Sequence, residues 1–348
     1  MNHSTHTHLF FTEPSRCHVT LIAKYCTDMY TCNQPYGARS WMPCVDLSAE
    51  RCPWEIELVV PKQCTAVAPG QLQDQLGVSD ESMRSFVYKT AKNEKYSAGS
   101  IVLSVGVYET VNDAQWPYIT HYCLPNRQRA LSHVTSYLPQ IIAFYENYLG
   151  NKYPFTSYKQ VFVEDAHSSV LSGASLSVLS THLLHDEKVI DQTFETRRLL
   201  ALSLAQQWFG HFIAVKSWSD QWLLFGLAGY MSYLFVLKVF GYNEFRYRLV
   251  RDVEYITQHA HVNQPLYNTN YTSPAELYSR LVFVKSTVTM YLLEKRLGTE
   301  GFQKLLSGLV VKNSEGDPPD TNVSTSKFLK LAKKLTGLEM KLFADKWM

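Results

Sequence analysis

The chain has 348 residues, a hydrophobic content of 46% and a charged content of 18%, values that are ordinary for a globular protein. Its length is large for a single hydrophobic core and favours two domains. The formal net charge of +2 excludes nucleic-acid binding through overall charge, so any such binding would need a local cluster of basic residues.

The first 125 residues alternate short apolar runs with turn formers, a pattern typical of a β-rich domain. Residues 54–61 have apolar side chains with a period of two and end in a proline, which predicts a strand. Residues 101–108 predict a second strand, apolar on both faces. The pair Pro125 and Asn126 marks the predicted boundary between a domain at 1–125 and a domain at 126–348.

The cysteines all lie toward the N-terminus, are odd in number and include no Cys-x-x-Cys pair, so they suggest neither a zinc knuckle nor a regular disulfide framework. We expect reduced thiols, as in a nuclear or cytosolic protein. The seven residues are Cys17, Cys26, Cys32, Cys44, Cys52, Cys64 and Cys123. The first six residues also lack the charged and apolar regions of a signal peptide.

Beyond residue 126 the apolar pattern becomes helical. The residues that recur at helical spacing are Leu131, Val134, Leu138, Ile141, Ile142 and Tyr145. A strand is predicted at 160–164, followed by a loop rich in serine and glycine at 167–175.

Two long helices are predicted next. The first covers 194–211, with Thr193 as its N-cap and Glu195 in its first turn. The second covers 222–240 and ends at Gly241; its uncharged stretch is shorter than the ~20 apolar residues of a membrane span, so we expect a buried core helix. The rest of the chain predicts further helices.

Residues 202–210, Leu-Ser-Leu-Ala-Gln-Gln-Trp-Phe-Gly, are similar to the metal-binding helix of a zinc peptidase. In such a helix two histidines at i and i+4 ligate zinc from one face, and the glutamate beside the first histidine acts as the base. Here Leu202 and Gln206 occupy the ligand positions, and Ser203 occupies the position of the base.

Four other segments, at 39–46, 144–150, 153–154 and 343–347, carry the same likeness. Together they make the region from Arg39 to Trp347 resemble the zinc aminopeptidases of the aminopeptidase N and leukotriene-hydrolase family. The resemblance implies an α+β fold, in which a saddle-like β-rich domain precedes an α-rich thermolysin-like domain. It also leads us to expect that the β-rich domain is incomplete at its start and that helical repeats would follow Trp347.

The other family positions have lost their reactive groups too. The family places its third ligand, a glutamate, 18 residues beyond the second histidine, and the 18 residues 207 to 224 separate Gln206 from Phe225. Leu176 stands where the family has the glutamate that holds the substrate amino terminus, and Phe283 where it has the tyrosine that steadies the reaction intermediate. The resemblance therefore implies a degenerate site without zinc, other cofactor or catalysis, packed more like core than pocket.

Shorter runs narrow the resemblance to a non-catalytic branch of the family that occurs in the general transcription factor TFIID. They lie at 120–125, 178–185, 190–193, 196–198, 203–207 and 218–222. The implied role is a nuclear scaffold in core-promoter recognition and pre-initiation assembly for RNA polymerase II. Its expected partners are other TFIID subunits, and contact with core-promoter DNA through the assembly is an open alternative. We expect it to bind neither a membrane nor a small-molecule substrate. Two alternatives stay open: an aminopeptidase with residual activity, and a module that binds peptides without cutting them.

Histidine pairs and a lysine cluster offer weaker signals. His182 and His185 lack a third ligand nearby in sequence, and His259 and His261 lie apart on a predicted helix, so we expect neither pair to bind metal. Lys327, Lys330, Lys333, Lys334 and Lys341 form a basic side opposite Phe328, Leu331, Leu335 and Leu338. A solvated helix face is the favoured interpretation, and contact of Lys330 and Lys334 with DNA phosphates is the alternative.

Overall fold

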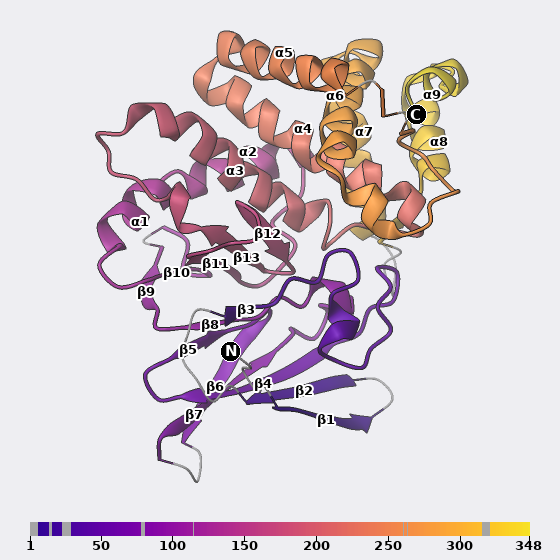
Figure 1. The fold of residues 1–348 in the computed structure, drawn as a ribbon. Coiled ribbons are helices and arrows are strands. Elements are labelled where there is room, and N and C mark those ends of the chain that lie inside the picture. Colours follow the sequence, from indigo (N-terminus) through magenta and orange to yellow (C-terminus); the bar gives the residue numbers. More distant parts are fainter. Residues whose placement is uncertain are drawn as a thin grey trace. The chain divides into compact units, whose positions relative to one another are not determined.

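The computed structural model describes residues 6–13, 16–22, 29–77, 81–113, 115–259, 261–262, 264–314 and 321–348. The chain packs into two compact units (Figure 1). The first unit comprises Met1–Pro139 and Phe155–Thr196, and the second comprises Gln140–Pro154 and Arg197–Met348. A β-rich first part followed by helices confirms the α+β class. The domain boundary at residue 125 stays a prediction.

The first unit begins with a five-stranded sheet in the order β1-β2-β4-β7-β6. Neighbouring strands are antiparallel except β2 and β4, which are parallel. A three-stranded antiparallel sheet has the order β3-β8-β5. The bounds are β1 His6–Glu13, β2 Arg16–Ile22, β3 Met29–Tyr30, β4 Trp54–Pro61, β5 Thr65–Val67, β6 Gln71–Gly77, β7 Met83–Lys89 and β8 Ser104–Gly106.

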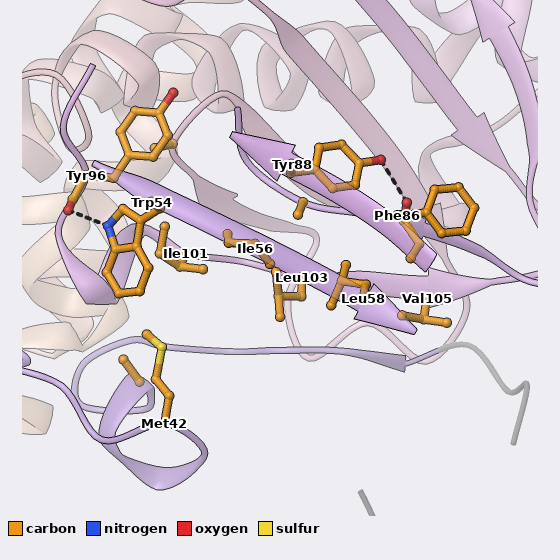
Figure 2. Packing of buried hydrophobic residues seen from close by; sticks show 14 of the residues in the cluster. Met42, Trp54, Ile56, Leu58, Phe86, Tyr88, Tyr96, Ile101, Leu103 and Val105 are labelled. Carbon is orange, nitrogen blue, oxygen red and sulfur yellow. Dashed lines mark hydrogen bonds between the residues drawn. The ribbon is translucent and has the colours of Figure 1, made fainter. Parts of the chain in front are cut away.

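Strand β4 confirms the strand predicted at 54–61 and supplies much of the core of these sheets (Figure 2). Its alternate residues Trp54, Ile56 and Leu58 are almost fully buried, as the period of two requires. The polar atoms that enter this core are satisfied: the Trp54 indole donates to the Tyr96 carbonyl oxygen at 2.9 Å, and the Tyr88 hydroxyl donates to the Ala66 carbonyl oxygen at 2.8 Å.

The strand predicted at 101–108 is wrong in extent, because only Ser104–Gly106 forms strand β8. Residues 101–103 are buried as expected, but their backbone bonds run to other partners. The Leu103 N–H donates to the Thr31 hydroxyl at 2.9 Å, and the Thr31 N–H donates to the Leu103 carbonyl oxygen at 3.0 Å. Residues 101–103 are therefore part of the core but do not form the hydrogen-bond pattern of a β-sheet.

A second five-stranded sheet in the first unit has the order β12-β13-β11-β10-β9. Strands β10, β11 and β13 are parallel, and β9 and β12 are antiparallel edges. Strand β11 confirms the strand predicted near 160–164, whereas the predicted loop at 167–175 contains β12 and is wrong there, because this segment pairs in the sheet. The bounds are β9 Glu109–Asn112, β10 Ile119–Cys123, β11 Tyr158–Val163, β12 Val170–Gly173 and β13 Leu176–Ser180.

The helical spacing of residues 131–145 is confirmed, but it spans two helices, α1 Gln128–Thr135 and α2 Leu138–Leu149. The helix predicted at 194–211 is α3, Ile190–Trp208. Thr193 is not its N-cap: its hydroxyl donates to the Val189 carbonyl oxygen at 3.2 Å from inside the first turn. Threonine hydroxyls inside helices often bond back to the preceding turn. The helix therefore begins at Ile190, before the predicted N-cap.

Helix α4, Gln221–Phe240, confirms the predicted buried helix, and Gly241 follows it with a φ of 84°. It is long and apolar enough to cross a membrane by length and composition, but 72% of its most apolar stretch is buried in the protein. Two glycines let α6, Arg280–Leu297, approach it closely. A Cβ on Gly226 would lie 2.8 Å from the Ser286 carbonyl oxygen, and one on Gly229 would strike the Thr287 hydroxyl.

The remaining elements of the second unit confirm that the C-terminal part is mostly helical. Short strands β14 and β15 pair in parallel. The bounds are β14 Ala214–Val215, η4 Trp218–Asp220, α5 Tyr242–Gln258, η5 Pro274–Tyr278, α7 Thr299–Ser314, β15 Asn322–Val323, α8 Thr325–Thr336 and α9 Lys341–Trp347.

Candidate functional site

Helix α3 places the peptidase-like positions on one face of the second unit. Leu202 and Gln206 are one turn apart, so their side chains share that face. Ser203 is fully buried and its hydroxyl donates to the Leu200 carbonyl oxygen at 2.8 Å, a bond that ties it to its own helix. The Gln206 amide oxygen is buried and has no hydrogen-bond partner among the described residues. Gln206 is thus the one residue at the three expected ligand positions that carries a polar side chain.

Phe225, at the expected position of the third ligand, and Phe283, at the expected position of the family's tyrosine, lie next to each other. Phe225 lies on α4 and Phe283 on α6, with ring centroids 5.8 Å apart. Tyr278 meets the Phe225 ring edge-on at 5.1 Å. Aromatic pairs of this geometry stabilise by about 0.5–1.5 kcal/mol each beyond their burial. An aromatic cluster therefore stands where the family has a carboxylate and a hydroxyl.

The residues at these positions do not fit a catalytic zinc. Such a zinc needs three nitrogen, oxygen or sulfur ligands from the protein, and Leu202 and Phe225 have no donor atom. In the described part of the chain no group of three or more His, Cys, Asp or Glu side chains is placed to hold a metal ion. The expected core-like packing holds for Leu202 and Ser203, whereas Gln206, Phe225 and Phe283 are only half-buried.

Leu176 belongs to the first unit, where it opens strand β13 and is fully buried. The turn before it is packed tightly against the rest of that unit. The Ala174 N–H donates to the Ser100 carbonyl oxygen at 2.9 Å, and the Ser175 hydroxyl accepts from the Gly70 N–H at 3.1 Å. An apolar side chain in this packed turn offers no anionic group to a substrate amine.

Lys159 is a buried cation beside this turn that the sequence analysis missed. It lies opposite Leu176 in the β11–β13 pairing, and its ammonium donates to the Gly70 carbonyl oxygen and, at 3.3 Å, to the Ser157 hydroxyl. Burial lowers the pKa of Lys159 to about 7, and the charge of Glu94 opposes that shift. The only signal in the sequence is a lysine inside a strand whose other residues are all buried.

The two histidine pairs differ in their surroundings, and the rings of His259 and His261 stack with centroids 6.3 Å apart. His182 lies in the short helix η3, Thr181–Leu183, while the ring of His185 packs edge-on against His133 at 5.5 Å. The helix predicted through His259 and His261 is wrong, since α5 ends at Gln258. His259 follows that end, with its Nδ1 2.8 Å from the Tyr255 carbonyl oxygen.

The lysine cluster is only partly as predicted. Lys330 and Lys334 are exposed one turn apart on α8, and Lys333 pairs with Glu339. The predicted apolar side is wrong at Leu335 and Leu338, which are 42% and 39% exposed. Helix α8 ends at Thr336, so Leu338 lies beyond it and does not continue the helical face.

The expectation of reduced thiols is wrong at Cys64, which is disulfide-bonded. Cys32, Cys44, Cys52 and Cys123 are not disulfide-bonded, and burial raises the pKa of Cys123 to about 11. An odd number of cysteines and irregular spacing could not indicate which thiol would be paired.

Comparison with known proteins identifies one matching family and several similar proteins. The peptidase family M1 domain matches residues 135–347. The chain is 33% identical to a Gallus gallus protein named transcription initiation factor TFIID subunit 2 and 32% identical to its Drosophila melanogaster namesake, over 92% of the chain in each case. It is 24% identical over 77% of its length to a probable aminopeptidase of Sulfurisphaera tokodaii. The chain spans about 30% of the length of these TFIID subunit 2 relatives.

Replacement of the buried lysine, Lys159→Met, should stabilise the protein most at pH 7 and below. Because the pKa falls from 10.5 to about 7 on folding, the unfolded chain binds more protons between these values, and wild-type stability rises with pH. The stability difference between the variant and wild type should therefore shrink by about 1 kcal/mol per pH unit from pH 7 to 9.5.

Urea unfolding followed by circular dichroism at several pH values measures this difference. Lys188→Met, at an exposed lysine, is the matched control and should show no such trend. A difference for Lys159→Met that does not change with pH would mean that the buried amine titrates normally.

Proposed function

The chain belongs to the peptidase M1 family, and within it we propose a non-catalytic scaffold subunit of the general transcription factor TFIID. In this role it contributes to core-promoter recognition and to pre-initiation complex assembly for RNA polymerase II, in the nucleus. The observation that carries the proposal is Leu202, Gln206 and Phe225 at the three ligand positions, in a chain whose similarity to proteins named TFIID subunit 2 covers 92% of its length.

Replacement of the ligands supports the non-catalytic part. A peptidase of this family uses zinc to lower the pKa of a bound water to near neutrality, and the water then attacks the peptide carbonyl. Without three ligands that water is not activated. Ser203 could not replace the base either, because its hydroxyl is buried and bonded to its own helix.

The packing supports the scaffold part. The half-buried aromatic rings of Phe225, Tyr278 and Phe283 hold one another where the family has reactive groups, so the helical frame keeps its order without a metal. Aromatic residues are also enriched at protein interfaces, and this chain has 22 tyrosines. Other TFIID subunits are its proposed partners.

Core-promoter DNA is the second proposed partner, with Lys330 and Lys334 as phosphate contacts. Both lysines are exposed and one turn apart, so they present two charges on the same side of α8. Lys333 already pairs with Glu339 and contributes less.

Affinity capture from nuclear extract tests the scaffold role. The tagged chain, and a form extended at both ends, should retain other TFIID subunits that mass spectrometry identifies. A zinc aminopeptidase of the same family serves as control bait and should retain none. If neither form of the protein captures a TFIID subunit, the proposal is wrong.

Metal analysis and a turnover assay separate the scaffold from an aminopeptidase with residual activity. The purified protein should hold far less than one zinc per chain and should not release the chromophore from an aminoacyl chromogenic substrate, because two of the three ligand positions have no donor atom. An active family member is the positive control. Stoichiometric zinc together with chelator-sensitive turnover would overturn the non-catalytic assignment.

Charge reversal of the two α8 lysines tests the DNA contact. Lys330→Glu combined with Lys334→Glu should weaken binding to promoter DNA and reduce the slope of log K against log salt by roughly one for each phosphate that is no longer neutralised. Lys92→Glu combined with Lys95→Glu changes the net charge equally at exposed positions of the other unit and is the matched control. Equal slopes for the two double variants would remove these lysines from the interface.

A further inference from the structure

A surface groove on helices α5 and α6 of the second unit is not used by any of the roles above. It encloses about 640 Å³ and is lined along the length of α5, from Tyr242 to Gln258, with Tyr291 of α6 on its other side. The two helices lie next to each other in Figure 1. Since all lining residues lie on helices, the groove offers no main-chain edge to which a strand could add.

The groove has an apolar floor and apolar walls. Phe245 and Leu249 are buried beneath it, while Tyr242, Val250 and Val253 remain 58%, 47% and 46% exposed on its surface. The Phe245 ring stacks on Tyr242 at 6.3 Å and packs against Tyr291 at 6.0 Å, so the floor is fixed. These exposed residues lie at helical spacing and form a strip along one side of α5.

Two opposite charges lie at different points along this strip. Arg246 and Glu254, both exposed, are the cation and the anion of the lining, and eight residues of helix separate them by roughly 12 Å. Lys295, whose ammonium lies 5.1 Å from the centre of the Tyr291 ring, adds a second cation beside the Phe245 end. Arg251 reaches Glu254 only at 4.0 Å with both side chains more than half exposed, so Glu254 can still pair with a ligand.

From this geometry we infer that the groove is the docking site for an amphipathic helix of a partner protein. The partner helix buries a face of apolar residues spaced i, i+4, i+7 and i+11 against Val250 and Val253. It carries one acidic side chain beside Arg246 and one basic side chain about two turns away, beside Glu254. The lining runs along a single helix of 17 residues, a length that matches one partner helix, and the sedimentation experiment below tests for a second copy.

This interaction goes beyond membership of a transcription complex, and purified protein alone tests it. The probe is an 18-residue fluorescein-labelled helical peptide with four leucines at the spacing above. One glutamate and one lysine, eight residues apart, lie along the edge of the leucine face. Two further peptides carry two glutamates or two lysines at those positions. Fluorescence polarisation measures their affinity for the full chain.

Wild-type protein should bind the mixed-charge peptide saturably and about threefold or more tightly than either like-charge peptide. Glu254→Arg should shift the preference to the peptide with two glutamates, since both charges of the groove are then positive. Val250→Asp should weaken all binding by at least about tenfold, because it places a charge in the apolar strip. Val311→Asp, at a valine that is 37% exposed on α7, is the matched control and should bind as wild type does.

Three results would overturn the inference. The first is no saturable binding of the mixed-charge peptide, and the second is binding that Val250→Asp leaves unchanged. The third is self-association of the chain, measured by sedimentation and abolished by Val250→Asp. That result would mean that a second copy of the chain binds in the groove. Each result is independent of capture from nuclear extract, so failure here and failure of the scaffold role are distinguishable.

Discussion

The close packing of α4 on α6 is the constraint on which the second unit depends. It requires glycine at 226 and 229, because a Cβ at either position would strike backbone or side-chain oxygen of α6. Helix α4 carries Phe225 and α6 carries Phe283, so the same packing sets the distance between the two rings. Helix α6 also supplies Tyr291, against which α5 packs at the groove. The degenerate site and the groove therefore share one rigid support.

The replacement of ligands by apolar residues is physically coherent. Histidine and glutamate side chains gathered without a metal would be desolvated charges and polar groups without partners, which is costly. Leucine and phenylalanine remove that cost, and the aromatic pairs stabilise the site further. Gln206 keeps one buried acceptor without a described partner, so the replacement is incomplete at one position.

Two buried ionisable side chains, Lys159 and Glu294, have hydrogen-bond partners supplied by the packing around them. In the first unit Lys159 donates to a carbonyl and a hydroxyl oxygen, and in the second the buried Glu294 accepts from the Tyr230 hydroxyl at 2.6 Å. Both groups are costly to bury and would be more so without these bonds. Neither is visible as a site in the sequence, because the carbonyl partner of Lys159 and the hydroxyl partner of Glu294 lie 89 and 64 residues away along the chain.

The sequence by itself determined the α+β class, the strand at 54–61 and the buried helix α4, because local periodicity carries that information. Only the tertiary structure decided that the strand predicted at 101–108 is limited to 104–106 and that residues 170–173 pair in a sheet. It also decided that Leu335 and Leu338 are exposed. It alone also revealed the pairing of Cys64, the burial of Lys159 and the groove on α5. These features depend on which distant segments supply hydrogen bonds and apolar cover, and a local pattern does not contain that information.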